Sequence, residues 1–327
     1  MPAGRNATMQ VGAQSDWSTI VAPTIQIPFR SESIRFETNT ISPDTLTGRR
    51  TVDRMDVTGK KVEGSFEIVC YPDSLGILAA AALGAEASAA AVDGSAVYDH
   101  VITPMSAVTG SSLPKLTITV DRVQAVKGYM GCKINRMSFA AQVNDYLRAT
   151  VDIRGYNEVT DTLASLSATS RRPLQFIDGS VTVDSTDYDE VRSLTLNIEN
   201  DLEDNLFVLN GSDKMIEIEP QDRRFTLEME VLYSADTEST REDKYKTGTE
   251  IAIVATFTSS ETIATGKYYT ARFNLPNCVI TGDPAFHASG PGRMTGSFQV
   301  TALENGGESP LTVTVRDGQA AKHLIPA

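Results

Sequence analysis

Short segments in which apolar and polar side chains alternate are the feature that most limits how this chain can fold. Residues 33–38 and 65–70 alternate in this way, as a strand with one buried face does. Further segments with strand character lie at 116–120, 130–139, 146–153, 193–199, 225–231, 251–257, 267–275 and 296–300. The sequence therefore predicts a mainly β fold.

Helix signals are confined to two places. An alanine-rich segment at 74–83 is followed by Gly84, a residue that commonly ends helices. A shorter charged segment at 240–246 is followed by Gly248. Each predicted helix falls between the second and third strand of its half of the chain.

The order strand, long loop, strand, helix and three further strands occurs twice, which predicts an internal duplication. Phe66 and Phe225 would be equivalent at an offset of 159 residues, and Val151 and Phe298 at an offset of 147. The alternative is that two β domains share this alternation without common origin.

This reading divides the chain into two tandem domains with terminal arms and a linker. The boundaries are an N-terminal arm at 1–28, a first domain at 29–160, a linker at 161–178, a second domain at 179–304 and a C-terminal arm at 305–327.

The charge of the chain excludes some partners. It carries 42 acidic and 29 basic side chains, a formal net charge of −13. Residues 1–165 hold 17 acidic and 15 basic side chains, and residues 166–327 hold 25 and 14. Such an acidic surface repels phosphate, so we expect the chain to bind neither nucleic acid nor an anionic membrane.

Residues that could perform catalysis are scarce. The histidines, His100, His287 and His323, are isolated in the sequence, and none has a His or Cys at metal-ligand spacing, so solvated or structural roles are expected. No phosphate-binding loop or nucleophile elbow is present. We therefore expect no enzyme and no cofactor.

The three cysteines, Cys70, Cys132 and Cys278, lie in apolar segments, and their odd number excludes a complete set of internal disulfides. We expect them to be buried thiols.

The best metal candidate in the sequence is the acidic run 184–190, with four carboxylates in seven residues. It lacks the glycine and the final glutamate of a calcium loop, so a solvated acidic turn is the default interpretation.

Several segments, taken in their order along the chain, resemble the tail tube proteins of long-tailed bacteriophages. They lie at 25–33, 42–50, 62–67, 71–76, 129–139, 147–152 and 194–200. The resemblance covers nearly the whole chain without one diagnostic motif.

The resemblance implies tandem β-sandwich domains of tube type, each with one short flanking helix, long loops between strands and extended terminal arms. Subunits of this kind form rings that stack into a hollow tube in the virion tail, after synthesis in the host cytoplasm. Two fused copies would give a trimeric ring with pseudo-sixfold symmetry. The implied partners are other copies of the chain, a tape measure protein, and tail terminator and tip proteins, while DNA passes through without specific binding and no membrane is involved.

Within this frame, acidic side chains on the polar parity of the strands are expected to line the channel, with outward-facing positions as the alternative. These candidates are Glu37, Glu67, Glu199, Glu228 and Glu230. Contacts between rings are expected at Arg49, Arg50, Lys60, Lys61 and Trp17, against the alternative of a solvated loop and arm.

The same sequence pattern also fits a different class of function. Two β-sandwich domains could form an adhesion module or another minor virion protein. The predicted helices, the buried cysteines and the absence of a signal-peptide pattern at the N-terminus argue against adhesion.

Overall fold

The computed structural model describes residues 4–43, 45, 51–52, 54–87, 89–105, 112–203, 205–288 and 292–324. Strands account for 53% of the residues, which confirms the mainly β prediction. In the ranges that are described, no helix is both long and apolar enough to cross a membrane.

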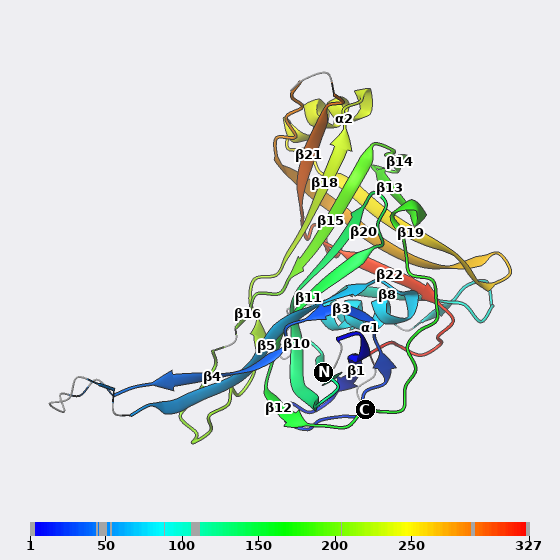
Figure 1. The fold of residues 1–327 in the computed structure, drawn as a ribbon. Helices are drawn as coiled ribbons and strands as arrows, with labels where there is room; N and C mark the ends of the chain where they lie inside the picture. The colour runs from blue at the N-terminus through cyan, green and yellow to red at the C-terminus, as the bar shows by residue number, and fades with distance from the viewer. Residues whose placement is uncertain are drawn as a thin grey trace.

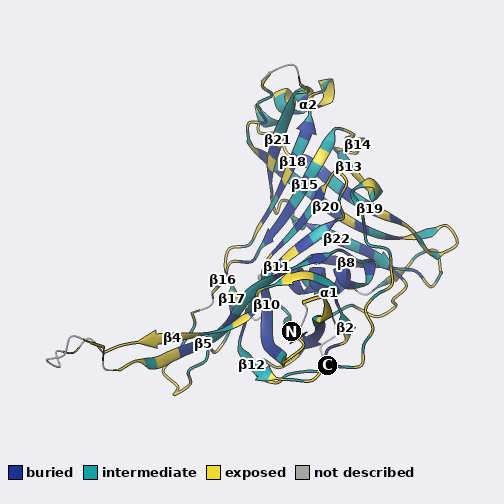
Figure 2. Cartoon of the chain, viewed as in Figure 1, coloured by how far each residue is buried: buried dark blue, intermediate teal, exposed yellow. Residues whose placement is uncertain are grey.

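One antiparallel sheet, here called the inner sheet, runs through both halves of the chain (Figure 1). Its strands are, in spatial order, β3 (Phe29–Glu32) with β4 (Arg35–Ile41), β5 (Asp56–Val69), β11 (Arg148–Gly155), β10 (Val126–Gln142), β15 (Val191–Glu199), β18 (Arg224–Leu232), β21 (Thr295–Ala302) and β20 (Lys267–Gly282). Burial alternates along these strands, as Figure 2 shows, so one face of the sheet covers the core.

Outer strands complete each half. In the first half they are β1 (Thr8–Gln14), β2 (Ile25–Gln26), β9 (Lys115–Asp121) and β12 (Asn157–Thr160). In the second half they are β13 (Gly179–Val183), β14 (Thr186–Asp187), β19 (Ile251–Ala264) and β22 (Thr312–Asp317). The long strands β10 and β20 pair with outer strands through their first parts and with inner strands through their last parts.

The same pairing plan occurs in both halves. The first half pairs β1 with β2 and β9, β9 with β10, β10 with β12 and β11, β11 with β5, and β5 with β3 and β4. The second half pairs β13 with β14 and β19, β19 with β20, β20 with β22 and β21, β21 with β18, and β18 with β15.

The residue offsets read from the sequence do not match this plan throughout. Phe66 lies opposite Val151, whereas Phe298 lies opposite Met229 rather than Phe225. The offset of 159 residues and the offset of 147 residues therefore disagree by four residues, the separation of Phe225 and Met229. Alternation hides such an error, because a shift by an even number of residues leaves every side chain on the same face.

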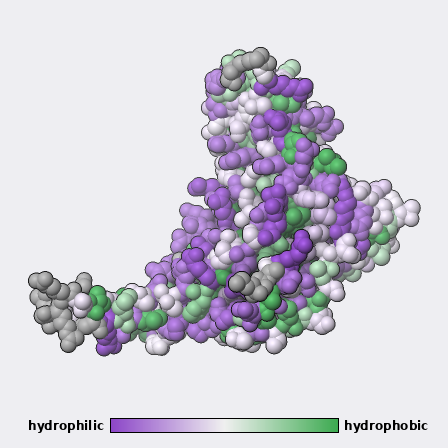
Figure 3. All heavy atoms as spheres, in the orientation of Figure 1, coloured by the Kyte–Doolittle hydropathy of each residue, from purple (hydrophilic) through white to green (hydrophobic). Residues whose placement is uncertain are grey.

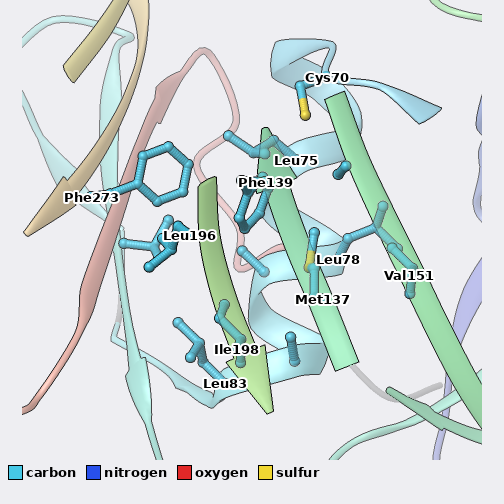
Figure 4. Packing of buried hydrophobic residues seen from close by; sticks show 14 of the residues in the cluster. Cys70, Leu75, Leu78, Leu83, Met137, Phe139, Val151, Leu196, Ile198 and Phe273 are labelled. Carbon is cyan, nitrogen blue, oxygen red and sulfur yellow. The ribbon is translucent and has the colours of Figure 1, made fainter. Parts of the chain in front are cut away.

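The halves are joined edge to edge, and separate domains are not seen. Seven residue pairs connect β10 at Arg136–Gln142 to β15 at Ser193–Glu199. A second joint pairs β22 with β8 (Tyr98–Pro104). This strand belongs to the segment between α1 and β9, here called the insertion, which also holds β6 (Gly84–Glu86) and β7 (Ala90–Ala91). One hydrophobic cluster, part of which is drawn in Figure 4, takes in residues of both halves.

The two helices differ in burial. The first, α1 (Pro72–Leu83), confirms the prediction at 74–83 and is buried everywhere except Asp73, and Gly84 ends it with a φ of 99°. The second, α2 (Ala235–Thr240), begins five residues before the predicted helix because Ser234 caps it, and it continues as the π-helical turn η3 (Arg241–Tyr245). The 3₁₀ turns are η1 (Gly4–Asn6) and η2 (Phe176–Asp178), and β16 (Leu202–Glu203) pairs with β17 (Glu219–Pro220).

The segments predicted as terminal arms contain strands of the fold. β1 pairs with β9 over seven residue pairs, and β22 lies between β20 and β8. The described parts of both segments therefore pack on their own chain.

Candidate functional site

The face of the inner sheet that points away from the core carries the predicted channel residues. Glu67 follows the buried Phe66 on β5, and Glu228 lies between the buried Leu227 and Met229 on β18. The strand register places Glu37, Glu199 and Glu230 on this face as well. All five candidates therefore share one surface, here called the polar face.

Arginines on the same strand or on a neighbouring strand neutralise most of these acids. An oxygen of Glu37 accepts from Arg35 Nε at 2.7 Å. Glu67 lies 3.5 Å from a guanidinium nitrogen of Arg30 and 3.4 Å from one of Arg148.

The second half shows the same pairing less completely. Glu199 and Glu230 lie 3.4 Å from guanidinium nitrogens of Arg136 and Arg192 respectively. Glu228 is exposed, faces Thr195 and Gln299 across the strands, and has no ion pair within the described ranges. It is the candidate whose charge the protein leaves uncompensated.

The polar face as a whole is mixed in charge. In the first half, six basic side chains lie among four acidic ones, namely Arg30, Arg35, Lys61, Arg136, Arg148 and Arg154 among Glu37, Glu63, Glu67 and Asp152. In the second half, Arg192 and Arg224 accompany three glutamates. Most of the acidic excess of residues 166–327 therefore lies elsewhere.

Two loops in equivalent positions leave the same end of the inner sheet. One is the hairpin of β4 and β5, which extends far from the rest of the molecule in Figure 1, and the other joins β15 to β18. Lys60 N donates to Asp213 O at 2.8 Å, the Lys60 ammonium pairs with the Asp213 carboxylate, and Lys60 forms a parallel bridge with Lys214. We call residues 35–41, 54–63 and 205–216 together the arm.

The predicted basic residues contribute to the arm in different ways. Lys60 ties its two parts together, whereas Lys61 lies on the polar face, 3.4 Å from a carboxylate oxygen of Glu63. Arg49 and Arg50 lie outside the described residues.

The arm exposes apolar side chains. Met55 and Ile41 are 66% and 58% exposed, and Val57, Leu209 and Ile216 are exposed too. Figure 3 shows hydrophobic atoms along this projection. Exposed apolar groups gathered on a projecting element indicate a surface that another protein covers.

Trp17 is half-buried and packs against its own chain. Its ring lies 5.3 Å from that of Tyr156, and Lys133 Nζ lies 5.4 Å from its centroid. The buried Lys133 ammonium donates to Ile218 O at 2.5 Å and to Glu217 Oε1 at 2.6 Å. Trp17 thus helps to anchor the loop that joins β15 to β18.

The acidic run begins in the tight turn between β13 and β14 and continues through β14. Asp184 accepts a hydrogen bond from Ala252 N at 2.8 Å and pairs with Lys244 Nζ at 2.7 Å. No group of metal-ligating atoms is found among residues 184–190, all of which are described.

The cysteines and histidines are the remaining side chains that could bind a metal or react. Cys70, Cys132 and Cys278 are buried free thiols, and burial raises the pKa of Cys278 to about 12, so the thiolate is disfavoured. His287 is exposed. His100 and His323 meet in one buried cluster with two carboxylates, which sequence spacing did not reveal because 223 residues separate them.

Comparison with known proteins identifies the family. A family model described as "Phage tail tube protein" matches residues 4–302. No curated protein matches the sequence. The chain therefore belongs to the phage tail tube protein family and is a structural, non-enzymatic component of the virion tail.

Proposed function

We propose that three copies of this chain close into a ring with pseudo-sixfold symmetry and that such rings stack into the tail tube. The observation that carries the proposal is the repeated pairing plan together with the joint between β10 and β15. A duplicated unit that already joins edge to edge within one chain offers the same joint between chains.

The edges needed for that joint lie at the two ends of the inner sheet. The equivalent of β15 is β3, whose outer edge has no strand partner within the described ranges. The equivalent of the last part of β10 is β20 from Val279 onward, which pairs with β21 on one side and has no second strand partner among the described residues. With Phe66 and Phe225 taken as equivalent, the register of the internal joint sets Val279 of one chain opposite Ser31 of the next. Ring closure would also cover two unpaired strand edges.

Cysteine cross-linking tests this arrangement. The double variant Ser31→Cys with Val279→Cys should form disulfides between chains on mild oxidation, because directly opposed strand residues lie within disulfide range. Denaturing gels should then show linked dimers and trimers, with a closed trimer as the end point. Each single variant is the matched control and should stay monomeric on the gel. Tubes without cross-links, or a ladder that continues past three chains, would contradict the trimeric ring.

In such a ring the polar face would line the channel, because the opposite face of the inner sheet is covered by the core. The pairing of Arg35, Arg136 and Arg148 with glutamates would leave few free cations to hold DNA phosphates. A lining of paired charges, with Glu228 as an unpaired acid, would let DNA pass without adhering. The acidic side chains expected in the channel would then lie among paired basic ones.

The arm would make the contacts between stacked rings. It leaves one end of the inner sheet and exposes Ile41, Met55 and Leu209, which a neighbouring ring would bury. Tape measure, terminator and tip proteins would be the further partners, inside and at the ends of the tube. DNA would cross the tube without specific binding.

A further inference from the structure

A buried cluster far from the polar face joins the C-terminal segment to the insertion in the first half. Glu86 lies at the end of β6, His100 on β8, Asp317 at the end of β22, and His323 beyond it. The side chains of all four are at most 6% exposed. The sequence predicts solvated or structural roles for the two histidines, and no cluster.

The imidazoles share their partners on both sides. Nδ1 of His100 and of His323 lie 2.9 Å and 3.1 Å from the same oxygen, Glu86 Oε1. Nε2 of His100 and of His323 lie 3.2 Å and 2.7 Å from the two oxygens of Asp317, and His100 Nε2 also lies 2.8 Å from Gln319 O. The rings are 4.1 Å apart, centroid to centroid.

This arrangement requires positive charge between the Nδ1 atoms and Glu86. A neutral imidazole carries one N–H, and when it donates that proton to Asp317 its Nδ1 lone pair faces a carboxylate oxygen. Two protonated imidazoles, or one divalent cation with two neutral imidazoles, both resolve the conflict and both balance the two carboxylates.

The geometry points to the divalent cation: we propose that Glu86, His100 and His323 bind a first-row transition-metal ion such as Zn²⁺, with Asp317 orienting both imidazoles from outside. Ligand atoms about 2.0–2.2 Å from one ion lie about 3 Å apart, and the two Nδ1-to-Glu86 distances, which are also hydrogen-bond lengths, meet that spacing. All three ligand groups offer atoms within 4.8 Å of one another.

Surrounding contacts fit a metal site. Histidine ligands commonly donate their second ring N–H to a carboxylate or carbonyl, as Asp317 and Gln319 would accept here. Glu86 also lines a surface pocket with Ala85, Lys322 and Leu324, so one of the three ligand residues borders solvent-accessible space. The donor set of two imidazoles and one carboxylate suits zinc and its neighbours rather than calcium or magnesium. The role would be structural, because the ion would fasten the chain end beside the joint of β22 with β8.

Protons compete with the ion in this site. Histidine binds a metal ion as the neutral imidazole, so binding displaces protons, strengthens as the pH rises and is measured at pH 8 or above.

The test uses untagged full-length protein titrated with ZnSO₄ and, separately, with CoCl₂. We expect about one Zn²⁺ per chain with a Kd below about 1 μM, a higher melting temperature with Zn²⁺, and cobalt absorption bands typical of four-coordinate N/O ligation. His323→Ala should weaken binding by more than tenfold, Asp317→Asn by about tenfold, and His287→Ala, an exposed histidine elsewhere, should change nothing.

The wild-type cobalt spectrum keeps the test independent of how the variants fold. Wild-type protein that takes up no metal at pH 8 and melts at the same temperature with Zn²⁺ as with a chelator would overturn the proposal and leave a cluster held by protons alone. Equal binding by wild-type protein and His323→Ala would overturn the ligand assignment. Neither result bears on ring assembly, which the cross-linking experiment tests separately.

Discussion

The two halves of the molecule share one strand plan but complete it differently. In the first half, α1 is buried along almost its whole length, and the insertion carrying β6, β7 and β8 lies beside it. In the second half, α2 is a short helix with Thr237 as its one buried residue. The repeated strands therefore suffice to define the unit, while the helix side can vary.

The difference in charge is equally informative. The second half holds most of the net negative charge of the chain, yet its part of the polar face carries few charged residues, and the first half carries a balanced set of both signs. Net charge of a segment is therefore a poor guide to the charge of one surface. Strand parity and cross-strand pairs decide that instead.

The largest expected difference between the halves concerns their helices. Leu78→Ala removes a fully buried side chain from α1 and should lower the free energy of unfolding by about 2–5 kcal/mol. Glu238→Ala in α2 removes a partly exposed side chain whose salt bridge with Arg241 is weak, so its cost should stay below about 1 kcal/mol. Urea unfolding of the unassembled protein measures both. Similar costs at the two sites would contradict the view that only the first helix is part of the core.

A smaller effect is expected where the second half caps the helix of the first. Arg223 Nη2 donates to the carbonyl oxygens of Ala82 and Leu83 at 3.1 Å, and Arg223 Nε donates to Asn200 Oδ1 at 2.8 Å. Arg223→Ala removes the charged donor from both carbonyl groups, which keep only the bonds from Asn200 Nδ2 and Met105 N, and should cost about 1–3 kcal/mol.

Its neighbour Arg224 supplies the matched control, since it is exposed on the polar face. Arg224→Ala should change the free energy of unfolding by less than about 0.5 kcal/mol. Equal losses in the two variants would show that capping across the halves contributes little.

Local patterns predicted the strands well because each inner strand buries one face, as Phe225, Leu227 and Met229 do on β18. The helix at 74–83 was equally visible, since its glycine stop is local. The joint of Arg136–Gln142 with Ser193–Glu199 could not be predicted, because pairing between distant segments leaves no local signal. It became apparent only when the strands were placed.

The same limit applies to side chains that act together. Glu199 was recognised as a polar-face residue, but its partner Arg136 is on another strand, so the neutralisation of that acid was invisible in the sequence. His100 and His323 were interpreted as isolated for the same reason. Trp17 packs on Tyr156 of its own chain, and the expected contact between rings stays a prediction for it.

The last prediction concerns the unpaired acid of the polar face. If this face lines the channel, Glu228→Lys puts a free cation into every subunit along the tube, and DNA ejection should slow several-fold because lysine binds phosphate. Glu228→Gln removes the charge without adding a cation and should have a weaker effect, since repulsion reaches only about 8 Å at physiological salt. Glu230→Lys should resemble Glu228→Lys but also leaves Arg192 without its partner. Ejection is followed by dye binding to released DNA from phage with tails of normal length. Identical ejection rates for wild type and Glu228→Lys would place Glu228 outside the channel and turn the polar face toward solvent or a neighbouring subunit.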